Sequence, residues 1–275
     1  MLKCKICMPH RNDITPETIE AIKNFPAEWN GIKFVGESIL NSNLIKARND
    51  LLWGNSDLGP FDNSYDYYLF WDSDVVGTID DFELMHSLNK PVVFGLYPYA
   101  EDRGIIGMVG GKYPKGYPGC VEGKDRIRVD EKRVFEGPDY WGGFGFCLIR
   151  KNVLYEIDYP WVEPRVIDTP PEYPRGSENV FDDIGFCLKM SDAGINPVLD
   201  NRLSLSHISR GHGQSPGKLP ANDIPSGIFE VKPNMDAEAM AAAGIVLQMA
   251  ERIKHLSEQV MQLQSSTHEK QPKTP

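Results

Sequence analysis

The stretch Tyr67-Tyr68-Leu69-Phe70-Trp71-Asp72-Ser73-Asp74 decides both the fold class and the chemistry to look for. Its apolar and aromatic residues predict a short buried strand, and two aspartates follow that strand directly. In an α/β sheet, ligands bind beyond the carboxyl ends of the strands, so Asp72 and Asp74 are expected to face that crevice. Carboxylate oxygens suit a hard divalent cation that neutralises the charge of a nucleotide diphosphate. The structural alternative is that such a triplet only caps a helix.

The segments on either side of this stretch alternate between strand and helix patterns. We expect a helix starting at Thr15-Pro16, further helices at 43–53, 80–88, 151–157 and 179–193, and strands at 2–8, 32–35, 91–96, 142–149, 197–199 and 204–208. Residues 97–140 are polar and glycine-rich, with a hairpin expected around Gly123-Lys124, and the prolines of 160–176 predict a long surface loop. The alternation predicts an α/β fold of the Rossmann-like type, with a mainly parallel sheet and helices on both faces.

The chain divides by pattern into three parts. Residues 1–232 carry the strand and helix alternation and are expected to form the catalytic domain. Residues 233–264 predict a C-terminal helix, and 265–275 form a polar tail that we expect to be disordered. The helix has an apolar stripe at coiled-coil spacing, which predicts a homo-oligomer: Ile245, Met249, Ile253, Leu256, Val260 and Leu263.

The composition indicates a soluble globular protein. Of 275 residues, 41% are hydrophobic and 25% charged, and the net charge of −10 disfavours a large nucleic-acid surface. A basic stretch between Lys112 and Arg133 is interpreted as a solvated hairpin. Five cysteines indicate reduced thiols and a cytoplasmic location, with Cys4 and Cys7 buried in a strand rather than holding zinc. We expect neither a signal peptide nor a membrane span.

Three further residues with acidic or basic side chains are candidates for chemistry. Asp182 and Asp183 open a predicted helix, where they either favour the helix dipole or supply a carboxylate that takes a proton from an acceptor hydroxyl. His207 follows a late strand, and a neutral imidazole suits Mn²⁺ as a ligand. A structural role for His207 is the alternative, and His212 is a nearby competitor.

Two weaker signals lie beside these positions. Gly142-Gly143 precedes a strand and either lets the backbone approach a ligand closely or forms a simple turn. Arg48-Asn49 lies on the helix before the Asp72 strand. Arg48 either contacts phosphate, braces the carboxylates, or is a surface arginine.

In this order, the motifs resemble the GT-A glycosyltransferase superfamily. The matching segments are Ala47-Arg48-Asn49, Asp72-Ser73-Asp74, Gly142-Gly143, Asp182-Asp183-Ile184-Gly185-Phe186-Cys187 and His207. The resemblance covers roughly residues 2 to 210 and does not assign a sub-family. Asp182 stands where the family's pattern has glutamate, so the pattern does not settle the acceptor contacts.

The resemblance implies a metal-dependent glycosyltransferase with a nucleotide-diphosphate sugar as donor and Mn²⁺ or Mg²⁺ as cofactor. The acceptor hydroxyl belongs to a glycan, a protein or a small molecule, with modified DNA disfavoured by the negative charge. By position, Asp74 and His207 would bind the metal, and Asp72 the ribose or a metal-bound water. Asp183 would be the general base of an inverting reaction, which we favour slightly, and Asp182 would orient the acceptor. The segment Pro9, His10 and Arg11 would flank the nucleotide base.

Two other functions compete with this interpretation. A nucleotidyltransferase acting on sugar phosphates also uses a metal and an acidic pair, but usually carries a glycine-rich basic loop after its first strand. This chain has Met8-Pro9-His10-Arg11-Asn12 there, with no glycine. A non-catalytic module that binds nucleotide sugars is the second alternative, and the intact Asp72, Asp74, Asp183 and His207 speak against it.

Overall fold

The computed structural model describes residues 1–10, 14–41, 43–53, 61–100, 106–112, 126–128, 130–168, 177–180, 182–208 and 229–231. All of them belong to one compact unit, Met1–Val231. The predicted C-terminal helix and tail, the turn at Gly123-Lys124, His212 and Arg11 lie outside the described residues. No helix within the described ranges is long and apolar enough to cross a bilayer.

The helices begin where the sequence places their caps. They are α1 (Pro16–Asn24), α2 (Leu44–Leu52), α3 (Ile79–Ser87), α4 (Val153–Glu156) and α5 (Asp182–Asp192). Thr15 caps α1 by accepting from the Thr18 backbone N–H, and Asn43 caps α2 in the same way. Thr78 and Asp81 form a capping box at α3. The predicted start at 179 was wrong for α5, because Ser177–Val180 is paired as a strand.

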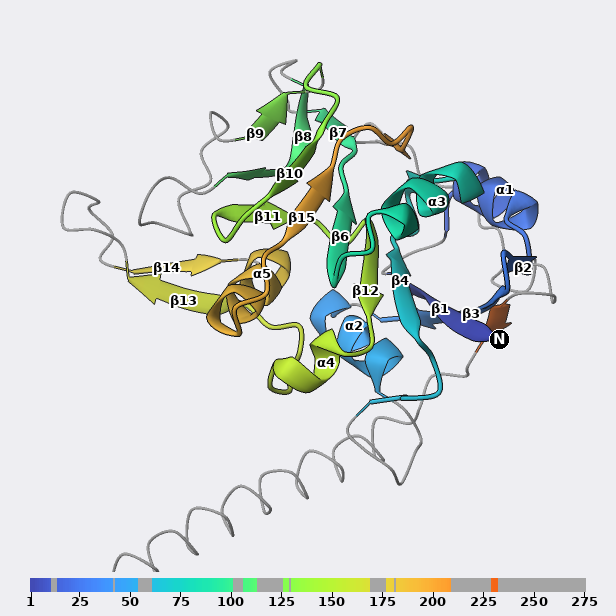
Figure 1. Cartoon of the computed structure of the whole chain (residues 1–275), viewed down its shortest axis with the longest axis horizontal. Helices are drawn as coiled ribbons and strands as arrows, with labels where there is room; N and C mark the ends of the chain where they lie inside the picture. Colours follow the sequence, from blue (N-terminus) through green and yellow to red (C-terminus); the bar gives the residue numbers. More distant parts are fainter. Residues whose placement is uncertain are drawn as a thin grey trace, which may run out of the picture. The chain divides into compact units, whose positions relative to one another are not determined.

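The main sheet has nine strands in the order β10-β15-β6-β12-β4-β1-β3-β17, with β2 paired to β3 (Figure 1). Strands β1, β3, β4, β6, β15 and β17 run one way, and β2, β10 and β12 run the other. Their bounds are β1 (Leu2–His10), β2 (Glu28–Trp29), β3 (Ile32–Leu40), β4 (Tyr67–Trp71), β6 (Val92–Gly95), β10 (Val134–Glu136), β12 (Phe146–Arg150), β15 (Val198–Asp200) and β17 (Phe229–Val231).

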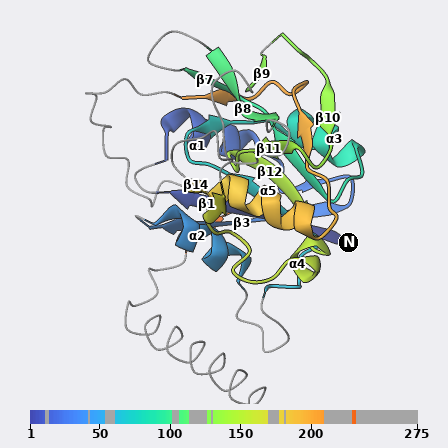
Figure 2. The ribbon, with the colours of Figure 1, turned by 90° about the vertical axis from the view of Figure 1, so that its left-hand side faces the viewer.

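Helices cover both faces of this sheet, as the sequence predicts for its class. Tyr68 and Phe70 of β4 belong to one buried cluster, which also holds apolar side chains of α2, α4 and α5. Leu69 and Trp71 belong to a second cluster with side chains of α1 and α3. Figure 2 shows α5 in the foreground with strands behind it. Because both faces of β4 are buried, the strand is a continuous apolar run rather than an alternating one. The mainly parallel α/β fold is thereby confirmed.

Smaller sheets flank the main one. The strand β8 (Ile106–Lys112) pairs with β7 (Pro98–Ala100), β9 (Arg126–Arg128) and β11 (Tyr140–Gly142), and β5 (Val75–Val76) pairs with β16 (Ser206–His207). A third pair joins β13 (Arg165–Asp168) to β14 (Ser177–Val180). The prediction of one long surface loop at 160–176 was therefore wrong for its first half, where Trp161 and Val162 are also buried. Apolar residues lie between the prolines: Trp161 and Val162 reach the core, and Val166 and Ile167 belong to β13. The number of prolines alone did not predict either feature.

Candidate active site

The carboxyl end of β4 meets a glycine loop at the same edge of the sheet. Strand β12 runs antiparallel to β4, with Phe146 opposite Trp71, so the residues before β12 lie where β4 ends. The backbone N–H of Asp72 donates to the carbonyl oxygen of Gly145 at 2.9 Å. The segment 142–145 and the aspartates after β4 are therefore neighbours, although they are far apart in the sequence.

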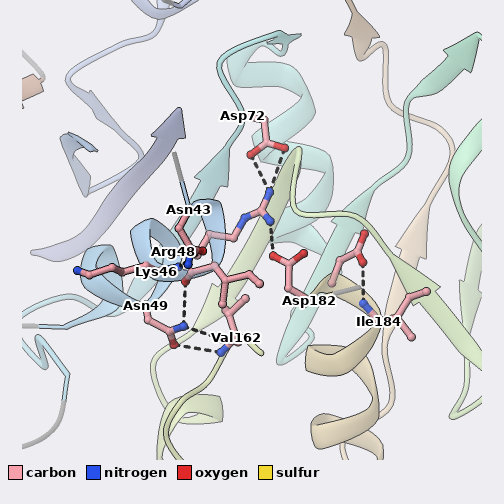
Figure 3. A network of polar contacts seen from close by, with 10 residues as sticks. Asn43, Lys46, Arg48, Asn49, Asp72, Val162, Asp182 and Ile184 are labelled. Carbon is pink, nitrogen blue, oxygen red and sulfur yellow. Dashed lines mark hydrogen bonds and ion pairs between the residues drawn. The ribbon is translucent and has the colours of Figure 1, made fainter. Parts of the chain in front are cut away.

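Arg48 of α2 joins two of the candidate carboxylates (Figure 3). Its Nη1 donates to Oδ2 of Asp182 at 2.5 Å, and its Nη2 donates to both oxygens of Asp72 at 3.2 and 3.3 Å. The guanidinium also lies over the ring of Phe144, 4.9 Å from its centroid. The side chain is only 8% exposed, which excludes the reading of Arg48 as a surface arginine. The planar guanidinium suits this task because it can donate in two directions at once.

The neighbouring Asn49 holds α2 in the position that Arg48 needs. Its side-chain amide donates to the carbonyl oxygens of Ile45 at 2.9 Å and Val162 at 2.6 Å, and its Oδ1 accepts from the Val162 N–H at 3.1 Å. Figure 3 shows these contacts tying the helix to the segment before β13. The Arg48-Asn49 pair thus has a divided role, with one residue facing the carboxylates and the other anchoring the helix.

The carboxylates do not share one environment. Burial raises the pKa of Asp72, Arg48 opposes that rise, and Asp74 adds to it. Burial and then the charge of Asp182 raise the pKa of Asp183 to about 6, although Arg48 acts to lower it. An Asp183 oxygen also accepts from the Ile184 backbone N–H at 2.8 Å. Asp183 is therefore ionised at neutral pH but is a stronger base than an ordinary aspartate.

A short strand pair brings His207 to Asp74. Strands β5 and β16 pair His207 with Val75, and the Ile208 N–H donates to the Asp74 carbonyl oxygen at 2.8 Å. Nε2 of His207 then lies 3.4 Å from Oδ2 of Asp74. The contact with the Asp74 carboxylate raises the pKa of His207, against the effect of its burial. An aspartate and a histidine from distant parts of the chain therefore meet at one point.

The Asp74–His207 pair fits two ligands of one divalent ion. Ligand atoms about 2.1 Å from an ion and at right angles to each other lie about 3 Å apart, close to the observed separation. Within the described ranges, no group of three or more His, Cys, Asp or Glu residues forms a metal cluster. The carboxylate of Asp72, also predicted as a metal ligand, accepts hydrogen bonds from Arg48. An ion at this pair needs its remaining ligands from water or from a bound diphosphate.

The other residues predicted to bind the donor lie at the ends of two strands, Pro9 and His10 at the end of β1 and Gly142 and Gly143 at the end of β11. Pro9 and His10 are the last two residues of β1 rather than loop residues, because they continue the ladder with Ile39 and Leu40. A Cβ on Gly142 would lie 2.5 Å from atoms of Phe94, and one on Gly143 would lie 2.5 Å from Val109. Contact with protein side chains therefore already requires glycine at both positions, and Gly142 ends a strand rather than forming a turn.

Tyr97, which the sequence motifs do not single out, also lies at this edge. Its ring stacks on the His207 imidazole with centroids 5.7 Å apart and an interplanar angle of 14°. Burial raises the pKa of Tyr97, and Asp72, Asp183 and Asp74 raise it further. The only signal in the sequence was an aromatic residue just past a strand, and such residues usually belong to the core.

Comparisons with known proteins find similarity in structure. No family model matches the chain, and no curated protein matches it. Among solved structures, A197 from STIV is 19% identical, over 76% of this chain and 87% of that chain, with a TM-score of 0.45. The catalytic domain of Drosophila beta1,4galactosyltransferase 7, in complex with xylobiose, is 13% identical over 76% of this chain and 72% of that chain, with a TM-score of 0.43.

Two further solved structures carry nucleotides. GalNAc-T7 with UDP, GalNAc and Mn²⁺ is 14% identical, over 80% of this chain and 45% of that chain, with a TM-score of 0.44. A CMP:2-keto-3-deoxy-manno-octonic acid synthetase complexed with CTP is 12% identical, over 91% of this chain and all of that chain, with a TM-score of 0.36. With identities and TM-scores this low, the activity of this chain has to be inferred from its own residues.

Proposed function

We propose that this chain is a divalent-metal-dependent glycosyltransferase that moves a sugar from a nucleotide-diphosphate donor to an acceptor hydroxyl. The observation that supports it most is the contact between Asp74 and His207 at the sheet edge that also holds Asp72. The half-buried Asp183, with its raised pKa, supplies a second kind of chemical group at the same edge. A metal-ligand pair and a separate base are the two elements that this reaction needs.

Asp74 and His207 would hold Mn²⁺ or Mg²⁺, with Mn²⁺ favoured because imidazole suits it better. The ion supplies positive charge that stabilises the departing diphosphate. Arg48 keeps the Asp72 carboxylate at the end of β4, where it can accept from a ribose hydroxyl or a metal-bound water. Pro9 and His10, at the end of β1, would flank the base together with Arg11, and Gly142 and Gly143 would line the donor side.

Asp183 would take the proton of the acceptor hydroxyl as that oxygen attacks the anomeric carbon, which gives inversion. Its neighbour Asp182 is held by Arg48 and would orient the acceptor. We also propose a reducing, cytoplasmic compartment, which the buried free thiols of the described residues support: Cys4, Cys7, Cys147 and Cys187.

The test is a screen of nucleotide sugars for Mn²⁺-dependent hydrolysis, combined with calorimetry of UDP and GDP in the presence of Mn²⁺. Asp74→Ala and His207→Ala should each weaken Mn²⁺-dependent nucleotide binding by roughly 10- to 100-fold. The fold should survive, because Asp74 lies in an exposed turn after the strand rather than in the core.

Asp80→Ala, at an exposed aspartate on α3, and His212→Ala are the controls and should change neither binding nor hydrolysis. Nucleotide binding that Asp74→Ala leaves intact would refute the metal site. Release of pyrophosphate from a nucleoside triphosphate and a sugar phosphate, without hydrolysis of any nucleotide sugar, would identify a nucleotidyltransferase instead.

A further inference from the structure

Tyr97 occupies a space that two glycines leave open. A Cβ on Gly145 would lie 2.4 Å from the Cε1, Cζ and hydroxyl oxygen of Tyr97, and one on Gly143 would lie 3.2 Å from the same oxygen. Any other residue at position 145 would collide with the ring. The glycines before β12 therefore make room for the Tyr97 side chain. Tyr97 is only 6% exposed and is thus almost buried.

The hydroxyl of this tyrosine lies in the acidic part of the site. The same Cβ position on Gly143 is 3.2 Å from the Tyr97 hydroxyl oxygen and 3.7 Å from Oδ2 of Asp183. Although the tyrosine is almost buried as a whole, its hydroxyl oxygen is not among the fully buried side-chain atoms of the described residues that lack a partner. The ring is therefore packed, while the polar end of the side chain keeps access to the site, as is usual for tyrosines with one apolar and one wet end. A hydroxyl in this position can donate to a molecule that binds at this edge of the sheet.

We propose that the Tyr97 hydroxyl donates a hydrogen bond to the sugar carried by the donor and that Tyr97 thereby sets donor specificity. This inference rests on the proposed function, which puts the diphosphate at Asp74 and His207 and the acceptor oxygen at Asp183. The transferred sugar must then lie between these two points, because its anomeric carbon is bonded to the diphosphate and is attacked by the acceptor oxygen. Tyr97 spans this interval, with its ring on His207 and its hydroxyl near Asp183.

The chemistry of the group suits a sugar better than a phosphate. The hydroxyl has three carboxylates in its electrostatic surroundings, Asp72, Asp74 and Asp183, and these disfavour a further anion beside it. A sugar hydroxyl is neutral and can accept from the phenol, which is protonated at neutral pH. A site built to hydrogen-bond one hydroxyl also discriminates against sugars that lack it or orient it differently.

The ring and the hydroxyl of Tyr97 have separable roles. Tyr97→Phe keeps the ring on His207 and removes only the hydroxyl, so the space at Gly145 stays filled. Tyr97→Leu also removes the stacking that orients the imidazole. The two variants therefore separate contact with the sugar from support of the metal ligand.

The experiment compares these variants with the wild-type chain, using UDP-glucose, UDP-galactose, UDP-N-acetylglucosamine and GDP-mannose as donors and UDP or GDP with Mn²⁺ as sugar-free probes. For Tyr97→Phe we expect kcat/KM for hydrolysis of the preferred donor to fall about 3- to 10-fold, as for the loss of one hydrogen bond. The preference between UDP-glucose and UDP-galactose should narrow, and the Kd of the sugar-free nucleotide should not change. Tyr97→Leu should weaken binding of the sugar-free nucleotide as well.

Tyr155→Phe, at an exposed tyrosine on α4, is the matched control and should behave as the wild type. Unchanged donor hydrolysis in Tyr97→Phe, or an equal loss for donor and sugar-free nucleotide, would overturn the role of Tyr97 alone. A wild-type chain that binds none of the probes would overturn the proposed function, and this inference with it.

Discussion

Arg48 shows why a cluster of aspartates is stable at this sheet edge. Its guanidinium contacts Asp72 and Asp182, and their charges, with that of Asp183, raise its pKa against the effect of burial. Removing one partner from a buried ion pair leaves the other charge uncompensated, which is usually costly. Arg48 therefore permits the acidic groups of two separate elements, β4 and α5, to be brought together.

Most residues of the candidate site could be named from the sequence, because acidic residues after strands and at helix starts have recognisable contexts. Asp72, Asp74 and Asp183 were named from these contexts, and His207 from its place in a late strand; their chemical roles stay predictions. The sequence could not decide among the three interpretations of Arg48, because the exposure of a side chain on a helix depends on which elements pack against it. Tyr97 was missed because nothing local distinguishes a tyrosine that packs on His207 at this sheet edge from one in the core.

The substitution Asp183→Asn should abolish turnover and at the same time stabilise the fold. Burial raises the pKa of the native carboxyl to about 6, above its value in the unfolded chain. The native state of the wild type therefore loses stability as pH rises from about 4 through about 6, where the carboxyl becomes charged. An asparagine carries no charge and escapes this loss, so we expect its Tm at pH 8 to be roughly 2–6 °C higher than that of the wild type.

Thermal unfolding at pH 8 and pH 5 checks the stability part of this prediction. The Tm difference should shrink at pH 5, where the wild-type carboxyl is largely protonated in the native state. The turnover part is measured as transfer of the sugar to an acceptor hydroxyl, because hydrolysis of the donor by water does not need the same base. A variant that is less stable than the wild type at pH 8 would contradict the burial of a charged Asp183.

At the scale of elements, the helices and strands with a clear pattern in their own sequence were the ones predicted correctly. The strand β4 was predicted with its observed bounds because a fully buried apolar run ends in two aspartates. Helix α1 was predicted from Thr15 and Pro16, which are a cap and a first-turn residue. The strands β5, β13, β14 and β17 were not predicted, because strands of two to four residues depend on their partners rather than on their own pattern.

Helix α5 carries Asp182 and Asp183, and Gly185 sets its distance from a neighbouring segment. A Cβ on Gly185 would lie 1.9 Å from the backbone oxygen of Glu163. Glycine to alanine usually stabilises a helix interior by about 1 kcal/mol. Here Gly185→Ala should instead destabilise the fold by roughly 1–3 kcal/mol, because backbone has to move to admit the methyl group. Thermal or urea unfolding measures this change, and donor turnover should fall because the first turn of α5 is displaced.

Ser191→Ala in the same helix is the matched control for Gly185→Ala. Its position is near the end of α5 and only partly buried, so stability should change by about 0.5 kcal/mol or less. If Gly185→Ala were as stable as this control, α5 would not approach the segment before β13 as closely as described.

At the scale of the whole molecule, strand direction is what the sequence could not supply. A mainly parallel sheet follows from alternating strands and helices, but the antiparallel insertion of β12 between β4 and β6 does not. That insertion brings the start of β12, with its glycines, to the edge where β4 ends. The site therefore depends on a topological feature that no single motif encodes.

The C-terminal residues 233–264 provide the last prediction, self-association of the full chain. Their apolar stripe from Ile245 to Leu263 is too narrow for a helix packed on its own domain and too apolar to be left in water. With Arg252 and Lys254 as its basic residues, the stripe would be drawn only weakly to anionic lipid. We therefore propose that it pairs with the same helix of a second copy.

Truncation after residue 235 tests this pairing without disturbing the sheet, because β17 ends at Val231 and keeps its parallel pairing with β3. Light scattering should show an oligomer for the full chain and a monomer for the truncated one, while Mn²⁺-dependent donor hydrolysis persists in both. Every proposed metal-binding and catalytic residue precedes residue 232, so hydrolysis has no reason to depend on the helix. A full chain that stays monomeric at about 50 µM, or a truncated chain that precipitates, would show instead that the stripe covers its own domain or has another partner.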